Sequence, residues 1–415
     1  MVEPFFQLLH LGGRTLFDQL FRCPRAVARH HGAPLRQERL AFLAHLTDLG
    51  LSPSTLRGYA PVLLVIVNSL DLASRPGETI TREEIKRKAT ANQSFLPVAT
   101  QWLHFLGRLQ QRAAPVSPYA KKIKAFAAYM EHERGLSPAT IRCCCWFARR
   151  FLDRLSTSGS SLRQVTPNRI DKAFKEMLDQ KAYAQVTIQG WACELRAFFR
   201  YAEMRGWCRK GLAACIRGPR IFAQASLPAG PSWDDVRRLL AMTEGDRQAD
   251  IRDRAILMLL AIYGLRAAEV RCLRLDDFDW ERELLTVACS KTRRTHTYPL
   301  TRSAGDAVLR YLKEVRRRSS RREVFLTLVG PIRPLRHSLW PVVAKRLRAL
   351  NVSLPHHGPQ ALRHACAARL LAQGLSLKEI GDHLGHLDPD TTRIYAKVDL
   401  VGLRQVADFD LGELV

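Results

Sequence analysis

A helical motif that occurs twice restricts the first half of this chain to helical modules. Residues 42–56 read FLAHLTDLGLSPSTL and residues 126–141 read FAAYMEHERGLSPATI, with one residue inserted in the second copy. In both copies apolar residues at helical spacing lead into Gly-Leu-Ser-Pro, where the serine suits a helix N-cap and the proline suits the first helical position. Each copy therefore predicts a helix, a turn and a second helix.

A further match at the same offset supports the repeat. The sequence ITREEI (80–85) resembles VTPNRI (165–170), and Pro53 and Thr81 have the same separation as Pro138 and Thr166. We expect an N-terminal segment (1–34) followed by two helical modules. The first (35–113) is an extra module and a candidate duplicate of the second (116–215).

The pattern changes after a linker (216–231) that carries proline, glycine and two arginines. Ser232 and Asp235 form a capping-box pattern, and RDRAILMLLAIYG predicts a mostly apolar helix that ends at Gly264. The stretch ELLTVACSKTRRTHTYPL (283–300) alternates apolar and polar residues about a short basic turn, which predicts a β-hairpin. The third domain (232–415) is thus expected to be α+β, and the whole chain mainly α with a small β-sheet.

Charge and cysteine usage limit the class of protein. Lys plus Arg outnumber Asp plus Glu by 65 to 39, a formal net charge of +26. Such an excess favours a polyanionic partner, most often nucleic acid, over an anionic membrane surface or a merely solvated face. The ten cysteines form no C-x-x-C pair, the N-terminus lacks the pattern of a signal peptide, and no apolar run approaches the ~20 residues that span a bilayer. We expect a soluble, cytoplasmic protein without a membrane partner.

Four segments of the third domain place polar groups where packing does not require them. Each has a structural interpretation by itself, such as a salt bridge, a solvated turn or a core tyrosine. The segments YGLRAAEV, CSKTRR, ALRH and LGHLDPDTTRIY supply Arg266 with Glu269, Lys291, Arg363, and His386 with Tyr395 nine residues later.

Together these motifs resemble the tyrosine recombinase (phage integrase) family. That family is marked by G-L-R-x-x-E, a lysine in a β-hairpin, H-x-L-R-H, and L-G-H followed nine residues later by the nucleophilic tyrosine. Here the motifs read GLRAAE, Lys291, QALRH and LGH with Tyr395, in the same order, and cover residues 230–400. The upstream module with RGLSPATI resembles the family's helical, SAM-like core-binding domain. The resemblance implies a core-binding module followed by a tyrosine recombinase catalytic domain.

The resemblance also implies a set of roles that suits phosphodiester exchange. Tyr395 would form a 3′-phosphotyrosyl link to DNA, which conserves bond energy and requires neither ATP, a metal nor another cofactor. Arg266 and Arg363 would clamp the non-bridging oxygens, with Glu269 supporting the arginine site. His386 would orient or deprotonate the tyrosine, whose ordinary pKa is ~10. Lys291 would protonate the leaving 5′ oxygen.

Gln360 departs from the family pattern, which has histidine at that position. A glutamine amide can donate a hydrogen bond to a phosphate oxygen, but it supplies neither charge nor a transferable proton. The expected loss is about 1–3 kcal/mol of transition-state stabilisation. A catalytically impaired DNA-binding regulator of the same fold is therefore the main alternative function.

Two other enzymes remain as alternatives. A type IB topoisomerase would share the tyrosine chemistry. A metal hydrolase would use a histidine set without an H-E-x-x-H pattern or accompanying carboxylates, namely His356, His357, His383 and His386.

The resemblance further implies double-stranded recombination sites as partner and a homotetramer on paired sites, with accessory recombinases or factors as further candidates. The tail motif with Leu400, Leu403 and Val406 or Ala407 is expected to dock on a neighbouring protomer. A prokaryotic, nucleoid-associated location is expected. The target sequence, the direction of the reaction and the type of mobile element stay open.

Overall fold

The structure is a computed structural model that describes residues 15–89, 93–110, 117–156, 162–179, 183–222, 227–288, 294–335, 338–398 and 404, without the side chains of 155, 156 and 177–179. Two compact units are distinguished: residues 111–225 form one, and residues 1–110 with 226–415 form the other. Three regions have separate apolar clusters, which lie within residues 16–109, 119–216 and 233–395.

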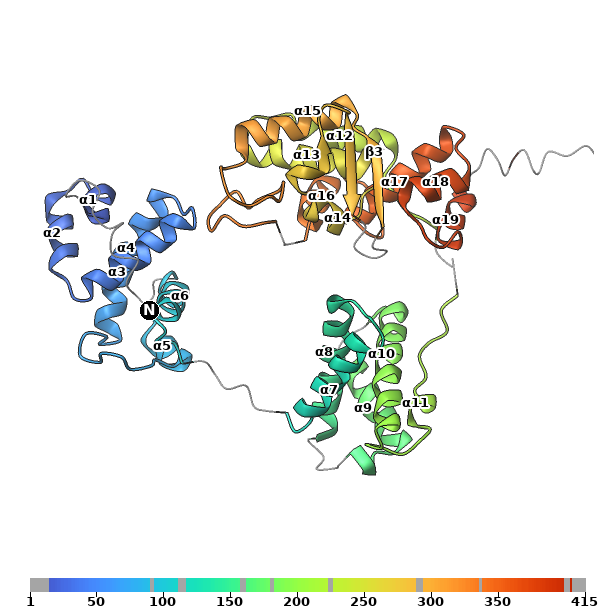
Figure 1. Ribbon diagram of the computed structural model, residues 1–415, viewed down its shortest axis with the longest axis horizontal. Coiled ribbons are helices and arrows are strands. Elements are labelled where there is room, and N and C mark those ends of the chain that lie inside the picture. The colour runs from blue at the N-terminus through green and yellow to red at the C-terminus, as the bar shows by residue number, and fades with distance from the viewer. Residues whose placement is uncertain are drawn as a thin grey trace, which may run out of the picture. The chain divides into compact units, whose positions relative to one another are not determined.

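The first helical region (15–110) is built of helices (Figure 1). The Gly-Leu-Ser-Pro turn forms as the sequence predicts: Ser52 accepts a hydrogen bond from the backbone of Thr55, and Pro53 starts the next helix. The helices are α1 (Leu16–Leu20), α2 (Pro24–Gly32), α3 (Arg36–Asp48), α4 (Pro53–Ser69), α5 (Arg82–Lys88) and α6 (Phe95–Phe105).

Helices α1 and α2 belong to the same core as α3–α6, a packing that the sequence did not indicate. Phe17 is fully buried in that core. The buried guanidinium of Arg39 donates to the backbone oxygens of His30 (2.9 Å), Ala33 (2.8 Å) and Pro34 (3.0 Å). These bonds satisfy carbonyls at and just beyond the C-terminal end of α2, which would otherwise lack partners. Residues 15–34 thus extend the expected module.

The second helical region repeats the arrangement of helix, turn and helix. Ser137 accepts a hydrogen bond from the backbone of Thr140 (3.2 Å), and Pro138 begins the following helix. Its core contains buried phenylalanines such as Phe147 and Phe198. The elements are α7 (Ala120–His132), α8 (Pro138–Ser156), the 3₁₀ turn Leu162–Gln164, α9 (Pro167–Asp179), α10 (Gln185–Met204) and α11 (Leu212–Cys215).

The third region combines helices with an antiparallel sheet in the order β1-β2-β3, in which Leu285 pairs with Tyr298 and Val287 with His296. The strands are β1 (Phe278–Asp279), β2 (Leu284–Ala288) and β3 (Thr295–Pro299). The helices are α12 (Trp233–Ala241), α13 (Gln248–Ile262), α14 (Ala267–Cys272), α15 (Arg302–Arg310), α16 (Trp340–Ala349), α17 (Pro359–Ala372), α18 (Leu377–Leu384) and α19 (Asp390–Arg393). The 3₁₀ segments Leu275–Asp277 and Ile394–Val398 and the π-helical turn Tyr311–Val315 complete it.

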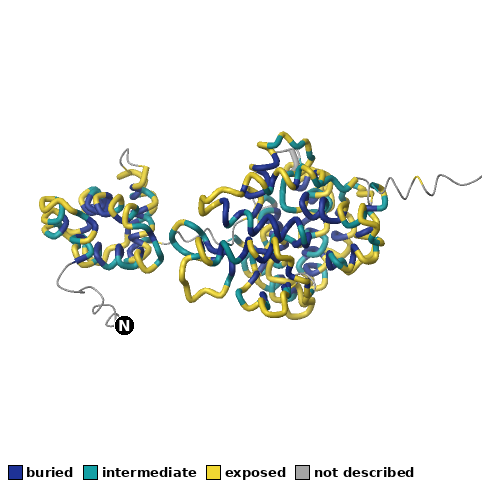
Figure 2. Tube along the Cα trace, turned by 90° about the horizontal axis from the view of Figure 1, so that it is seen from above, coloured by how far each residue is buried: buried dark blue, intermediate teal, exposed yellow. Residues whose placement is uncertain are grey.

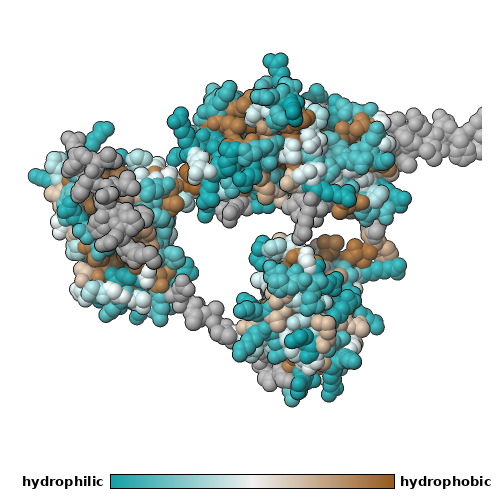
Figure 3. Space-filling view, in the orientation of Figure 1, coloured by the Kyte–Doolittle hydropathy of each residue, from teal (hydrophilic) through white to brown (hydrophobic). Residues whose placement is uncertain are grey.

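Helix α13 is the centre of this third region. An unbroken run from Ala255 to Ala261 is buried, and α12, α14, α15, α16 and α17 pack around the helix. The mostly apolar sequence of α13 therefore reflects burial on all sides. Figure 2 shows buried trace inside each body, and Figure 3 shows hydrophilic side chains over most of the visible surface.

The expected fold class, mainly α with a small β-sheet, is confirmed. Within the described ranges, no helix combines the length and apolar character needed to cross a membrane.

Candidate active site

The site begins at the turn between α13 and α14. Gly264 has φ +61°, and a Cβ placed there would lie 2.6 Å from Leu384 Cδ2. Both the left-handed backbone and the contact with the end of α18 therefore require glycine. The turn places Arg266 at the N-cap of α14.

Arg266 is fixed by Glu269, as the spacing of the two residues suggested. The backbone N–H of Arg266 and its Nη1 donate to the two carboxylate oxygens of Glu269, at 2.7 and 2.8 Å. The Glu269 side chain is buried, whereas a quarter of the Arg266 side chain is exposed. A buried carboxylate therefore holds a guanidinium that still reaches the surface.

Arg363, on the first turn of α17, joins two parts of the site. Its side chain is 2% exposed, and its two terminal nitrogens donate to the backbone oxygens of Gly264 and Leu384, each at 2.6 Å. Burial, and then the nearby charge of Arg266, lowers the pKa of Arg363. The two arginines therefore lie close enough to repel each other, an arrangement that an anion would stabilise.

Tyr395 lies in the 3₁₀ segment Ile394–Val398 and is 1% exposed. Burial raises the pKa of its hydroxyl to about 12, while the charge of Arg363 opposes that rise. The hydroxyl oxygen is 3.0 Å from Nδ1 of His364, the residue that follows Arg363 on α17. The phenol is therefore protonated at neutral pH and hydrogen-bonded to an imidazole.

His386 follows Gly385, which ends α18 with φ +66°. Its Nδ1 lies 2.7 Å from the hydroxyl of Thr392. Burial lowers the pKa of His386 to about 4, with further contributions from the charges of Arg363, Arg266 and His364. His386 is thus neutral at physiological pH and lies within the field of both arginines.

Strand β3 of the β2–β3 hairpin lies near the turn at Gly385, which follows α18. The hydroxyl of Tyr298 donates to the backbone oxygen of His383 (2.8 Å), and a Cβ at Gly385 would lie 2.9 Å from His296 Nε2. Strand β3 therefore packs against the end of α18. Lys291, predicted at the tip of this hairpin, lies outside the described residues, as do the tail residues Leu400, Leu403, Val406 and Ala407.

Gln360 lies on the first turn of α17 and is exposed. With glutamine at this position, the hydrogen bonds of Arg363 and the contact between Tyr395 and His364 are in place. The departure from the family pattern thus leaves these parts of the site assembled.

His364 is the site residue for which the sequence suggested no role. It stands within QALRH beside Arg363, which was a signal that it lies near the site. Its contact with Tyr395 depends on how residues 394–398 pack against α17, which no local pattern shows. Burial, then the charge of Arg363, lowers the pKa of His364, which favours the neutral imidazole.

The histidines proposed for a metal hydrolase do not form a ligand set in the part of the chain that the structure describes. No three His, Cys, Asp or Glu side chains are grouped there as metal ligands. His357 instead lies 3.0 Å from the backbone oxygen of Val352 through Nε2.

Comparisons with known proteins agree with the fold. Residues 232–400 match the model of the phage integrase family, and residues 123–206 match the model named phage integrase, N-terminal SAM-like domain. The chain is 32% identical over 294 residues to tyrosine recombinase XerC of Alcanivorax borkumensis, covering 69% of this chain and 92% of that protein. It is 29% identical over 289 residues to tyrosine recombinase XerA of Thermococcus kodakarensis, covering 69% and 94%.

Solved structures share the fold at low sequence identity. The XerH recombinase, in a post-cleavage complex with difH substrate, matches with a TM-score of 0.52 at 14% identity, covering 84% of this chain and 95% of that one. An integrase of transposon Tn1549, in complex with circular intermediate DNA, matches with a TM-score of 0.53 at 17% identity, covering 69% and 98%. The chain belongs to the phage integrase family of tyrosine recombinases, as the motifs predicted.

Proposed function

We propose that this protein cuts and rejoins double-stranded DNA at specific sites through a 3′-phosphotyrosyl intermediate on Tyr395. The observation that carries the proposal is the convergence of Arg266, Arg363, His386 and the Tyr395–His364 pair at the turn between α13 and α14. The solved relatives XerH and the Tn1549 integrase were captured on DNA, which supports DNA as partner. The chemistry of the site residues suggests a role for each of them in a reaction that uses neither a metal nor ATP.

The two arginines form the phosphate site. Guanidinium groups present planar forks that bind phosphate oxygens in a bidentate manner. Because Arg363 lies in the field of Arg266, a phosphate bound between them relieves repulsion that the empty site carries. Charge that develops on the non-bridging oxygens then strengthens both interactions, which accelerates the reaction.

His364 is the base that accepts the proton of Tyr395. The phenol is protonated and the imidazole neutral, and in the tautomer with its proton on Nε2 the hydroxyl donates to Nδ1 across 3.0 Å. That distance is within the range for direct proton transfer. Arg363 stabilises the phenolate that results, because its charge already acts to lower the pKa of Tyr395.

His386 then has a different role from the one that the sequence suggested. Its Nδ1 is occupied by the Thr392 hydroxyl, and with Nδ1 as acceptor the proton lies on Nε2. A neutral imidazole held in this tautomer donates a hydrogen bond to a phosphate oxygen. Gln360 donates another through its amide.

The strand-transfer step balances as follows. The Tyr395 oxygen forms a bond to phosphorus, the bond between phosphorus and the 5′ oxygen breaks, and the phenolic proton passes to His364. Lys291 protonates the departing 5′ oxygen. Attack by the free 5′ hydroxyl of a partner strand reverses the sequence and releases the tyrosine.

Tyr395 and Arg363 must become accessible before they meet the phosphate, because they are 1% and 2% exposed. Residues 394–398 therefore move when DNA binds, and contacts between protomers in a tetramer on paired sites are a means to stabilise the exposed state. The C-terminal tail and accessory factors are candidates for those contacts. We place the reaction in the cytoplasm, on nucleoid DNA.

Trapping of a covalent adduct tests the proposal. The wild-type chain is incubated with a pool of nicked duplexes of random sequence, and DNA that stays attached to denatured protein is sequenced. We expect a site-specific adduct with wild type and with Tyr59→Phe, a partly buried tyrosine of α4. Tyr395→Phe should bind DNA and form no adduct. An adduct with Tyr395→Phe would assign the nucleophile elsewhere, and no adduct with wild type would favour a regulator.

A further inference from the structure

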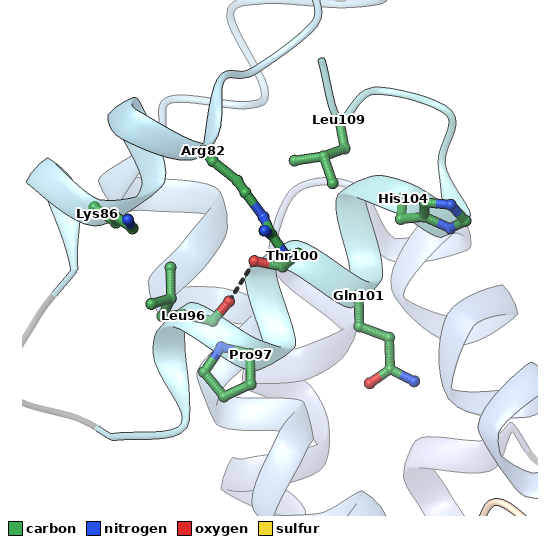
Figure 4. Close-up of a pocket in the computed structure, with 8 residues that line it drawn as sticks. All are labelled: Arg82, Lys86, Leu96, Pro97, Thr100, Gln101, His104 and Leu109. Carbon is green, nitrogen blue, oxygen red and sulfur yellow. Dashed lines mark hydrogen bonds between the residues drawn. The ribbon is translucent and has the colours of Figure 1, made fainter. Parts of the chain in front are cut away.

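A groove opens between α5 and α6 of the first helical region, outside the residues that match the family models (Figure 4). Arg82 and Lys86 from α5 and Gln101 and His104 from α6 form its polar rim, and Leu96 contributes to its apolar floor. Arg82 extends from α5 towards Thr100 of α6. The groove has a volume of about 600 Å³.

The cations of this groove are not used by the rest of the fold. Arg82 and Lys86 are exposed and form no ion pair with any described residue. Glu84, on the same helix, is paired with Arg75 at 2.6 Å, and no acidic residue lines the groove. The groove therefore presents two positive charges that form no ion pair with a described residue.

The neutral polar groups of the groove are also available. The side chains of Gln101 and His104 are exposed and form no hydrogen bond with other described residues. Thr100 differs, because its hydroxyl donates to the backbone oxygen of Leu96 (2.7 Å). Two hydrogen-bonding side chains on α6 thus face the same opening as the two cations on α5.

The walls of the groove are held in place by buried contacts. The Arg108 guanidinium donates to the backbone oxygens of Glu78 (2.9 Å) and Arg75. Ile80 N donates to Arg108 O (2.7 Å), and Gln110 N donates to Ile80 O (2.8 Å). These bonds join the segment before α5 to the segment after α6, so the rim residues project from a fixed frame.

We infer that this groove binds the sugar–phosphate backbone of double-stranded DNA, so that residues 15–110 form a second DNA contact besides the matched regions. Residues four apart on a helix are neighbours, with ~5–6 Å between Cβ atoms, so Arg82 and Lys86 reach neighbouring phosphates of one strand. Glutamine side chains are frequent partners of phosphate oxygens. The inference rests on the proposed function, because the chain must act on DNA.

The charge of the groove favours contact with the phosphates of a DNA backbone. Both charged residues of the lining, Arg82 and Lys86, are cations, and they lie beside the apolar residues Leu96, Pro97 and Leu109. The net charge of +26 favours a polyanion as occupant. The contact should therefore add affinity and length of footprint without sequence preference.

Paired charge removals on one helix test this inference in the full-length chain. Arg82→Ala with Lys86→Ala removes the cations of the groove. Arg87→Ala with Lys88→Ala removes the same charge from exposed positions of α5 that do not line it. Affinity for a mixed-sequence duplex several turns long is measured by fluorescence anisotropy over a range of KCl concentrations.

The groove variant should bind about tenfold more weakly, and the slope of log K against log salt should fall by about two. The control variant should keep the wild-type slope. Equal changes in the two variants, or an unchanged slope in the groove variant, would overturn the inference.

Adduct formation separates this result from the proposed function. At saturating protein, the groove variant should form the Tyr395 adduct at the wild-type rate. If the groove variant keeps the wild-type salt slope and the wild-type protein forms the adduct, only the inference about the groove is refuted. If the groove variant has a reduced salt slope but the wild-type protein forms no adduct, only the proposed function is refuted.

Discussion

The two helical regions have the same internal plan and differ in the exposure of their second helix. The helices α3–α6 follow the order of α7–α10, and Pro53 and Pro138 open equivalent helices after Ser52 and Ser137. Ile85 and Ile170 are buried at equivalent places in α5 and α9. Helices α6 and α10 both end at a glycine with positive φ. The plan is thus repeated in caps and core positions.

The difference lies on the second helix of each region. In α8, Arg149 is exposed and Arg150 stacks on Trp146, which is itself 54% exposed. Leu64, at the position in α4 that matches Arg149, is buried. Helix α1 packs against α4, and the groove of the first region carries its exposed cations, Arg82 and Lys86, on α5. One scaffold therefore offers more than one face for a polyanion, and an added helix changes which face is free.

The largest effect should come from a substitution in the active site, which lies in the third region and in neither helical region. We expect His364→Ala to reduce the single-turnover rate of adduct formation by about 10²–10⁴-fold, the usual contribution of a general base. Binding affinity should stay near wild type, since His364 contacts Tyr395 and not the basic faces. The measurement is adduct formation at saturating protein on one suicide substrate.

The pH profile distinguishes a base from a purely structural role for His364. Its pKa lies below the ordinary value, so the imidazole is neutral and able to accept a proton at pH 7. The wild-type rate should therefore be constant near neutral pH and fall as acid protonates His364 below its ordinary pKa of ~6.5. His364→Gln should lack that acid limb. A His364→Gln variant with the wild-type profile would reject the assignment.

Removal of residues 1–110 should have the next largest effect. If the first region contributes only contacts with the DNA backbone, its deletion should weaken DNA binding by about ten- to a hundredfold. This is the loss expected when a few phosphate contacts are removed. Adduct formation at saturating protein should change little. If the truncated protein is folded and saturated with DNA but does not cleave it, residues 1–110 are needed for cleavage and not only for DNA binding.

Local sequence patterns predicted the caps and the arginine–glutamate pair because these depend on neighbours within one turn. Ser52, Ser137 and Ser232 all accept the expected backbone bonds, and Arg266 is bonded to Glu269. The addition of α1 and α2 to the first core was not predictable in this way. It depends on Phe17 and on the buried guanidinium of Arg39, which reaches across several turns of chain.

The site was predictable as a set of residues and less so as a set of contacts. The motifs identified Arg363, His386 and Tyr395, and the structure brings them together through the turn at Gly264 and the end of α18. Which histidine contacts the tyrosine is decided by the packing of residues 394–398 on α17, between segments distant in sequence. Lys291 stays a prediction.

A smaller effect tests the equivalence of the two regions directly. Gly107 and Gly206 have φ +68° and +65°, and a Cβ at either meets no atom within 4 Å. Gly→Ala at each position should therefore cost only the strain of a left-handed backbone, about 1–2 kcal/mol. Native-state hydrogen exchange in the last turns of α6 and α10 measures each cost locally. Costs that differ severalfold would show that the two helix ends are not equivalent.

The smallest expected effect concerns the two N-caps. Ser52 accepts from Thr55 N at 3.3 Å and Ser137 accepts from Thr140 N at 3.2 Å, and each also contacts the hydroxyl of the same threonine at 2.9 Å. Ser→Ala removes one cap from α4 or α8, at a typical cost of ~1 kcal/mol. We expect Ser52→Ala to reduce hydrogen-exchange protection less than Ser137→Ala does. Helix α4 is held by buried residues on more of its surface than α8. Exchange in the first turn of each helix measures this difference. A larger loss of protection in α4 than in α8 would mean that the cap, and not the packing of α1 and the core, holds the start of the second helix in the first region.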